Sequence, residues 1–217
     1  HPEGIIAQSE NNAAALFGAG MTCYSTEGSS QCIRAMLYLA LQYARREGKN
    51  PRILAGRNVH KTFVTAAGLL DFQVNWLPAT ESYLSCGVAD WKALEQQLCA
   101  LLPAAVYVTS PDYLGNEIDL GELSRLCHQY GALLLVDNAH GAYLHFLPQP
   151  RHPLDLGADL CCDSAHKTLP ALTGAAYLHL SKAVPAWLKA MSKEAMALFG
   201  STSPSYLILQ SLDLMNP

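Results

Sequence analysis

The sequence predicts an α/β protein in which a mostly parallel sheet is covered by helices on both faces. Short apolar and β-branched runs alternate with longer stretches of helical period along all 217 residues, and this alternation is typical of such folds. Half of the residues are hydrophobic and 15% are charged, so the chain can bury a sizeable core and lacks the composition of a disordered segment. Polar residues directly follow five of the predicted strands, at the sheet edge where α/β proteins bind ligands.

Each element is predicted from its own pattern. Apolar and β-branched runs predict strands at residues 21–25, 52–55, 73–77, 105–109, 132–137, 158–163 and 175–179. Stretches of helical period predict helices at residues 10–17, 30–47, 60–70, 90–101, 120–130, 184–197 and 205–214. Pro148, Pro150 and Pro153 predict a surface loop at residues 146–153. Neither a repeat nor a linker divides the chain, so we expect one domain over residues 1–217.

Charge and apolar patterning exclude two classes of partner. The formal net charge is −4 and the cations are scattered, so the sequence lacks the basic footprint of a nucleic-acid-binding protein. The longest apolar run, residues 98–108, is interrupted by Pro103 and is too short to cross a bilayer. The sequence does not open with a signal-peptide pattern. We therefore expect neither a nucleic acid nor a membrane as partner.

The seven cysteines indicate a reduced, cytoplasmic protein. Their number is odd and none forms a C-x-x-C pair, which argues against a disulfide framework and against a zinc site. We expect no other metal site, because the two His–Asp pairs, His140 with Asp137 and His166 with Asp163, match no familiar ligand spacing. The sequence has no G-x-S-x-G elbow either, so a serine hydrolase is unsupported.

Lys167 is the first candidate for chemistry. It lies just past a predicted buried strand, in the segment 163–170, which reads DSAHKTLP. One interpretation is an ordinary exposed turn lysine. The other is an amine held near a carbonyl cofactor and made nucleophilic by partial desolvation and neighbouring positive charge. In that case Ser164 and His166 could donate hydrogen bonds to a phosphate group.

Asp137 is the second candidate. It ends the all-apolar run LLLV, and NAHG follows it. Burying a carboxylate is costly unless a cation meets it, so the residue is either a capping aspartate or the partner of a protonated pyridine nitrogen. Such a partner keeps the ring an electron sink. The small side chain of Ala139 would let a flat ring lie close by.

Two further segments could complete a cofactor site. Gly28, Ser29 and Ser30 precede a predicted helix, where amides and hydroxyls can bind a phosphate, although serine-rich helix caps are common. His60, in RNVHK, either caps its helix or stacks on a ring opposite Ala139. The loop at residues 110–115, SPDYLG, would face the same cofactor but carries little information alone.

Taken together, these segments resemble the ornithine/lysine/arginine decarboxylases, a group of fold-type-I pyridoxal-phosphate enzymes. The segment 164–173, SAHKTLPALT, is similar to the family's cofactor-attachment signature. Segments at the expected order and spacing agree with it: HPEG at residues 1–4, EGSS at 27–30, RNVHK at 57–61, DNAHG at 137–141 and STSPSY at 201–206. The resemblance spans essentially the whole chain, and the lysine motif is highly specific.

The resemblance implies a fold, a cofactor and a role for each site residue. The fold would be the large domain of an aspartate-aminotransferase-like enzyme that binds pyridoxal 5'-phosphate. Lys167 would hold the cofactor as a Schiff base, Asp137 would pair with the ring nitrogen and His60 would stack on the ring. His140 would lie close to the ring. The phosphate would be bound by the loop of Gly28, Ser29 and Ser30 together with Ser164 and His166 from the lysine segment.

The implied reaction is decarboxylation of arginine, lysine or ornithine to agmatine, cadaverine or putrescine, as in polyamine biosynthesis. Other fold-type-I reactions, such as transamination or aldol cleavage, stay open as alternatives, since one cofactor site serves many reactions. A truncated chain without activity is a further alternative. The resemblance also implies a homodimer or larger homo-oligomer.

The chain departs from the family pattern at two residues. Glu27 stands where Asn is common and Asp112 stands where Thr is usual, and we expect either change to weaken cofactor affinity. The family's enzymes also have an N-terminal segment and a small C-terminal domain. We therefore interpret residues 1–217 as a large-domain fragment and expect that, alone, it is not a competent decarboxylase.

Overall fold

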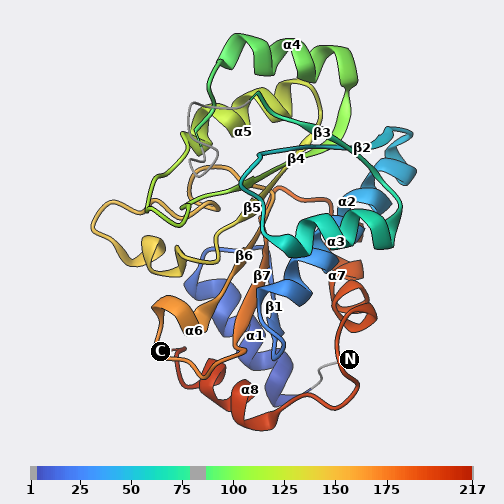
Figure 1. Ribbon diagram of the computed structural model, residues 1–217. Helices are drawn as coiled ribbons and strands as arrows, with labels where there is room; N and C mark the ends of the chain where they lie inside the picture. Colours follow the sequence, from blue (N-terminus) through green and yellow to red (C-terminus); the bar gives the residue numbers. More distant parts are fainter. Residues whose placement is uncertain (1–3, 79–86, 217) are drawn as a thin grey trace.

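The computed structural model describes residues 4–78 and 87–216 (Figure 1). Within these residues a seven-stranded sheet has the order β1-β7-β6-β5-β4-β2-β3. Neighbouring strands from β6 through β3 are parallel, and β7 is antiparallel to both of its neighbours. The strands are β1 (Met21–Ser25), β2 (Asn50–Ala55), β3 (Gln73–Trp76), β4 (Pro103–Thr109), β5 (Leu133–Asp137), β6 (Leu160–Asp163) and β7 (Ala176–Leu180).

The helices alternate with these strands. They are α1 (Ile5–Leu16), α2 (Ser29–Glu47), α3 (Lys61–Leu70), α4 (Trp91–Leu101), α5 (Leu120–Gln129), α6 (Ala165–Thr168), α7 (Ala186–Leu198) and α8 (Tyr206–Asp213), with a 3-10 helix η1 at Ala142–Phe146. Local chemistry fixes several of their ends. Asp90 caps α4 by accepting from the backbone amides of Lys92 and Ala93, and α2 ends at Gly48, whose φ of 63° suits glycine.

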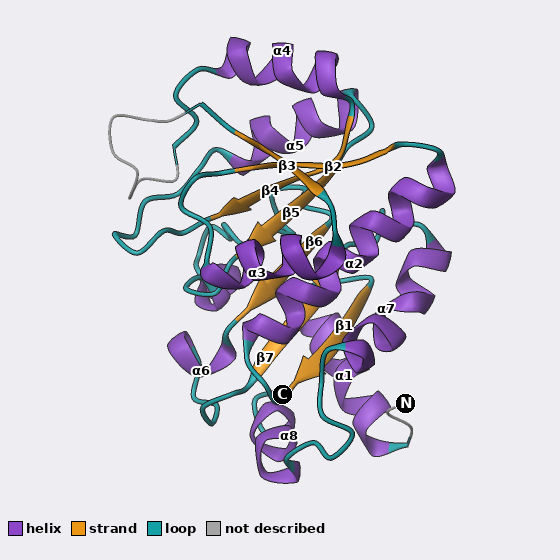
Figure 2. Cartoon of the chain, turned by 45° about the vertical axis from the view of Figure 1, so that its right-hand side comes forward, coloured by secondary structure: helices purple, strands orange, loops and turns teal. Residues whose placement is uncertain are grey.

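The sheet has helices on both faces (Figure 2), and a separate apolar core lies on each face. Side chains of successive strand residues point to opposite faces, so in β4 Ala105 and Tyr107 join one core while Val106 and Val108 join the other. Helices α2, α3 and α7 cover the first face, and α4 and α5 cover the second. The expected α/β fold, with a mostly parallel sheet and helices on both faces, is confirmed.

The structure differs from the sequence prediction in three places. Helix α1 begins at Ile5, five residues before the start predicted for the helix at residues 10–17. The short helices η1 and α6 were not expected, because four- and five-residue helices have no room for a hydrophobic period. The loop at residues 146–153 is exposed at Pro148 and Pro150, but it is not entirely a surface loop, since His152 and Pro153 are buried. No helix in the described ranges is both long and apolar enough to pass through a bilayer.

The carboxyl ends of the parallel strands place polar residues at one edge of the sheet. Strands β2, β4, β5 and β6 end there at Ala55, Thr109, Asp137 and Asp163. Strand β1 ends at the same edge at Ser25, because it is antiparallel to β7, which is itself antiparallel to β6. The five polar segments that follow strands in the sequence therefore begin at this edge.

Candidate active site

A small hollow lies at this edge of the sheet. Its enclosed volume is about 20 Å³. Nine of the described residues line it: Ser29, Asn58, His60, Thr109, Tyr113, Asp137, Ala139, His140 and Lys167. Ser29, His60, Asp137, Ala139, His140 and Lys167 are among the residues that the sequence identified. Segments separated by more than a hundred residues thus meet at one point.

Asp137 forms the floor of the hollow at the end of β5. Its side chain is buried, with 2% exposure, and its oxygens accept from the Ala139 amide at 3.2 Å and from the Tyr107 hydroxyl at 3.3 Å. Burial raises the pKa of Asp137 above its usual value, although the Ala139 amide and the nearby His60 and Lys167 oppose that rise. A carboxylate in this state is stabilised by any cation that enters the hollow.

Lys167 and His140 meet above Asp137. The Lys167 side chain extends from α6, and its amine nitrogen lies 3.2 Å from Nε2 of His140. Burial, followed by the neighbouring Lys167 charge, lowers the pKa of His140 below its usual value. A neutral His140 can accept a hydrogen bond from the amine at Nε2. The ring of His140 also contacts the Tyr113 ring edge-on, with 5.1 Å between centroids.

His60 lies at the start of α3 and both caps that helix and lines the hollow. Its Nδ1 accepts from the Thr62 backbone amide at 3.2 Å and lies 2.9 Å from the Thr62 hydroxyl. The Thr62 hydroxyl in turn lies 3.1 Å from that of Ser30. The two interpretations of His60 from the sequence are therefore compatible, since capping through Nδ1 leaves the ring facing the hollow.

The predicted phosphate ligands form a second group beside the hollow. The hydroxyl of Ser164 donates to that of Ser29 at 2.9 Å, which joins the segment before Lys167 to the start of α2. Gly28 precedes that helix with a φ of 74°, a conformation that favours glycine. Nδ1 of His166 lies 3.0 Å from the Ala175 carbonyl oxygen and donates to it, so Nε2 is the nitrogen that could reach a ligand.

Two lining residues, Asn58 and Thr109, were not identified as site residues from the sequence, whereas Tyr113 belongs to the loop at residues 110–115 that was expected to face the cofactor. The side-chain nitrogen of Asn58 and the hydroxyl of Thr109 are buried without a hydrogen-bond partner. Buried polar groups are normally satisfied, so these two atoms are available to a ligand in the hollow. Asn58 lies two residues before His60, and Thr109 is the last residue of β4. Their place at the carboxyl ends of strands was the signal that could have revealed them.

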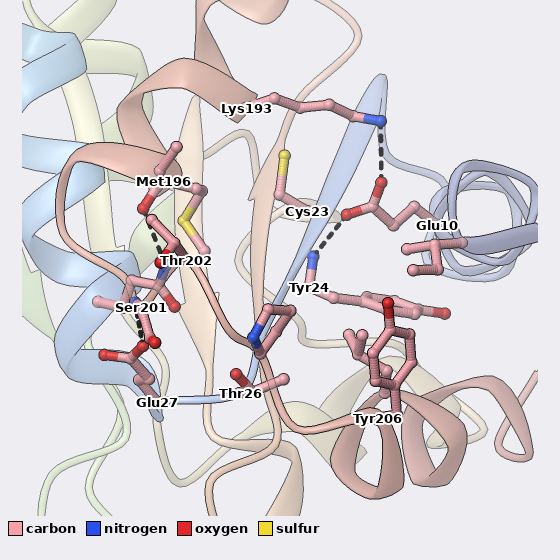
Figure 3. A pocket seen from close by; sticks show the side chains of 15 residues that line it. Glu10, Cys23, Tyr24, Thr26, Glu27, Lys193, Met196, Ser201, Thr202 and Tyr206 are labelled. Carbon is pink, nitrogen blue, oxygen red and sulfur yellow. Dashed lines mark hydrogen bonds and ion pairs between the residues drawn. The ribbon is translucent and has the colours of Figure 1, made fainter. Parts of the chain in front are cut away.

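Neither of the two departures from the family pattern lines the hollow. Asp112 is buried, and its carboxylate accepts from the amides of Leu114 and Asn116, so it closes its own turn. Glu27 accepts a hydrogen bond from the backbone amide of Ser201 (Figure 3). It lines a larger cavity of about 470 Å³ between α1, β1, α7 and α8. Both carboxylates thus have structural partners, and neither lines the small hollow.

A buried histidine–aspartate cluster adjoins the site and was missed from the sequence. Asp163, His152 and His179 are all fully buried, with His152 Nε2 2.9 Å and His179 Nε2 3.3 Å from the Asp163 carboxylate. The amide of Leu154 donates to Nδ1 of His152. In the neutral ring Nε2 therefore carries the proton and donates to Asp163. One ligand atom from each of the three side chains lies within 4.8 Å of the others, so they form one compact buried cluster.

The side chains in and beside the hollow match, by their chemistry, a flat cofactor that carries a positive ring nitrogen, a carbonyl and a phosphate. Asp137 would meet the ring nitrogen, the Lys167 amine would meet the carbonyl, and His60 and Ala139 would lie on the two ring faces. Hydroxyls at Ser29 and Ser164 would meet the phosphate. The side chains of Lys167 and Tyr113, which also line the hollow, are exposed to solvent.

Comparison with known proteins shows the family to which the chain belongs. Residues 1–216 match the family model described as Orn/Lys/Arg decarboxylase, major domain. The arginine decarboxylase of Bacillus subtilis is 32% identical over 221 residues, which cover 98% of this chain and 43% of that protein. The arginine decarboxylase of Bacillus cereus is 31% identical and is matched over 99% of this chain and 46% of that protein. The chain spans less than half the length of these relatives.

Solved structures show the same fold. Lysine decarboxylase A from Pseudomonas aeruginosa superposes with a TM-score of 0.79 at 23% identity, over 98% of this chain and 31% of that one. L-threonine transaldolase from Pseudomonas fluorescens gives a TM-score of 0.77 at 18% identity, over 98% and 48% of the two chains. At these identities the likeness concerns the fold alone. By its match to the family model, however, the chain belongs to the Orn/Lys/Arg decarboxylase family of pyridoxal-phosphate-dependent amino-acid decarboxylases.

Proposed function

We propose that this chain is the cofactor-binding domain of a decarboxylase that converts arginine, lysine or ornithine to the corresponding amine, with Lys167 holding pyridoxal phosphate as a Schiff base. Family membership supports the reaction class. Relatives named arginine decarboxylase and structural neighbours named lysine decarboxylase support a basic amino acid as substrate. The polyamine precursors agmatine, cadaverine and putrescine would be the products.

One observation carries this proposal. The buried carboxylate of Asp137 and the amine of Lys167 line the same hollow although 30 residues separate them in sequence (167 − 137). When bound, pyridoxal phosphate supplies an electron sink for the pair that remains after a carboxylate leaves. Asp137 would keep a proton on the ring nitrogen, which maintains that sink. His140 would orient the Lys167 amine through its neutral Nε2.

The other residues would bind and orient the cofactor. His60 and Ala139 would hold the ring between them, and burial of the ring on both faces would exclude water from its reacting side. Ser29, Ser30, Ser164 and His166 would bind the phosphate, with the N-terminal amides of α2 favouring its negative charge. The unpartnered atoms of Asn58 and Thr109 would supply further hydrogen bonds within the hollow.

The experiment is to add pyridoxal phosphate to the purified chain, record the visible absorbance, reduce with borohydride and map the labelled peptide. We expect a covalent label on Lys167 and none in the Lys167→Ala variant, while Lys182→Ala, a change at an exposed lysine of another loop, keeps the label. A label on Lys61 or Lys182 in the unaltered chain would show that the cofactor lysine is assigned wrongly.

The substrate is tested separately, in the protein to which this domain belongs. Carbon dioxide release from labelled arginine, lysine and ornithine identifies both the reaction and the preferred amino acid. Formation of a keto acid in place of carbon dioxide would contradict decarboxylation and favour transamination. Cleavage that yields an aldehyde would favour an aldol reaction. Because the chain covers less than half of its relatives, we expect little turnover from residues 1–217 alone.

We further propose a homo-oligomer in the cytoplasm. Ile5, Tyr206, Leu207 and Leu214 are apolar side chains with 69–76% exposure. They lie on α1, on α8 and directly after α8, and these two helices are at one end of the molecule (Figure 1). Apolar surface of this kind favours association. All six cysteines in the described ranges are unpaired, which supports a reducing compartment, and Cys86 lies outside those ranges. Analytical ultracentrifugation measures the oligomeric state directly.

A further inference from the structure

Three neutral donors from three different segments converge on the Asp137 carboxylate. The Tyr107 hydroxyl, from β4, donates to Oδ2 at 3.3 Å. The backbone amide of Ala139 donates to Oδ1 at 3.2 Å, and the Cys162 thiol, from β6, donates to Oδ1 at 3.7 Å. Tyr107 and Cys162 are fully buried on strands that flank β5 in the sheet.

This arrangement gives the two oxygens of the Asp137 carboxylate different numbers of donors. A carboxylate offers about four lone-pair positions. Two donors occupy Oδ1, whereas the Tyr107 hydroxyl is the donor at Oδ2. Oδ2 therefore keeps acceptor capacity for one more donor, and the charged ring nitrogen of the cofactor is the donor that the proposed function supplies.

Both side-chain donors keep their protons under ordinary conditions. Burial, with the negative charge of Asp137 added to it, raises the pKa of Tyr107 well above its usual value, and the same two causes raise the pKa of Cys162. Neither group becomes an anion beside Asp137. Each can act on Asp137 only as a hydrogen-bond donor, and hydrogen bonds to the charged form stabilise that form.

The Tyr107 ring is also held in place. Its centroid lies 4.6 Å from that of Phe63, at an angle of 37°, and Phe63 packs in turn against Phe72 and Trp76. Phe63 lies in α3, one turn after His60. The hydroxyl of Tyr107 therefore projects toward Asp137 from a rigid aromatic group, and its direction does not depend on a bound ligand.

We propose that Tyr107 and Cys162 are positioning residues which keep Asp137 ionised and fix its Oδ2 toward the ring nitrogen of pyridoxal phosphate. Neither side chain lines the hollow, so neither is a catalytic residue, and each acts through Asp137. Tyr107 has the larger part, since it is the donor at the oxygen that faces the cofactor. This inference rests on the proposed role of Asp137.

The first test measures the dissociation constant of pyridoxal phosphate for the full chain by titration. Tyr107→Phe keeps the packed ring and removes one hydroxyl, so we expect about fivefold to tenfold weaker binding. The visible absorbance of the bound cofactor should also change its position or its pH dependence, because the charge on the ring nitrogen is less well held. Tyr177→Phe is the matched control, because Tyr177 is also fully buried, on β7. The dissociation constant of this variant for pyridoxal phosphate should lie within about twofold of that of the unaltered chain.

The second test places the same change in the Asp137→Asn background. If Tyr107 acts through Asp137, Tyr107→Phe should then weaken binding by less than about twofold, as a double-mutant cycle requires of coupled residues. An undiminished fivefold effect in that background would overturn the inference. A second result would also overturn it. In that result Tyr107→Phe binds pyridoxal phosphate as tightly as Tyr177→Phe, although Asp137→Asn binds it poorly.

The proposed function fails in a different way. If Asp137→Asn alone binds the cofactor as tightly as the unaltered chain and shows the same absorbance, Asp137 does not meet the ring nitrogen, and the proposed role of Asp137 is wrong. Cys162→Ala supplies a second variant of the donor group should Tyr107→Phe not fold. It should weaken binding about twofold to threefold in the Asp137 chain and leave binding unchanged in the Asp137→Asn chain.

Discussion

The side-chain amine of Lys167 lies 3.2 Å from Nε2 of His140, within hydrogen-bond distance. The two residues are on separate segments, after β6 and β5, and both line the hollow above Asp137. Because burial lowers the pKa of His140, its ring is neutral near pH 7 and Nε2 can accept a proton from the amine. The contact thus links the proposed cofactor lysine to a residue that can move its proton.

Removal of this acceptor should slow covalent attachment of the cofactor. We expect the rate of borohydride-trappable linkage on Lys167 to fall about tenfold in His140→Leu, and less in His140→Gln, whose side-chain oxygen can still accept. The rate in the unaltered chain should decline as the pH falls below the usual histidine value of 6.5, through the lowered pKa of His140. Equal rates in all three proteins would contradict this role.

Asp137→Asn should make the cofactor-free chain more stable. The pKa of Asp137 in the folded chain is raised above its usual 3.8, so folding makes ionisation of this carboxyl less favourable. The folded chain therefore loses stability as the pH rises from the usual pKa through the raised one. At pH 7 the Asn variant should gain about 1 kcal/mol, or ~2–4 °C in melting temperature. The difference should vanish well below pH 3.8, which differential scanning calorimetry can check. Added pyridoxal phosphate should stabilise the unaltered chain more than the variant.

Asp163→Asn should be strongly destabilising. The His152 and His179 imidazoles hold the pKa of Asp163 below its usual value despite complete burial. Asparagine offers one acceptor oxygen in place of two to the buried donors of His152 and Asn138, and a buried donor left without an acceptor costs about 1–3 kcal/mol. Because the folded pKa is depressed, this contribution is present above pH 3.8 and is lost as the pH falls through the folded value.

Denaturant unfolding at several pH values measures that dependence. The matched control is Asp71→Asn, at an exposed residue with a φ of 52° that asparagine also tolerates. The control should unfold like the unaltered chain. A loss of stability in Asp163→Asn that is the same at pH 2 and pH 7 would show that the Asp163 charge is not the cause.

Gly141→Ala should disturb the loop that carries His140. A Cβ at residue 141 would lie 2.1 Å from the Asn138 side-chain oxygen and 2.7 Å from Cδ of Pro111, so the loop must shift. We expect a loss of about 2 kcal/mol in stability together with weaker cofactor binding. Gly121→Ala in α5 is the control, since its Cβ would meet its nearest neighbour at 3.5 Å. That change should be neutral or slightly stabilising.

Much of the fold could be predicted from the sequence because its elements carry local periods. The long helix α2 and the apolar strands β4 and β5 lie within two residues of their predicted bounds. The sequence also predicted that Asp137 and Lys167 lie close together. Each lies at or just after the end of a strand, and parallel strands have their carboxyl ends at one edge of the sheet. By contrast, α6 and η1 are too short to show a period.

The remaining parts of the site depend on contacts that no local pattern records. The sequence by itself determined the strand–helix order, the family resemblance and the candidates Lys167, Asp137 and His60. Only the tertiary structure brought Tyr107 and Cys162 to the Asp137 carboxylate and buried His152 against Asp163. The physical reason is that these contacts run sideways between neighbouring strands or from a loop into the core. Side-chain reach and strand register decide them, whereas hydrophobic period is set along the chain.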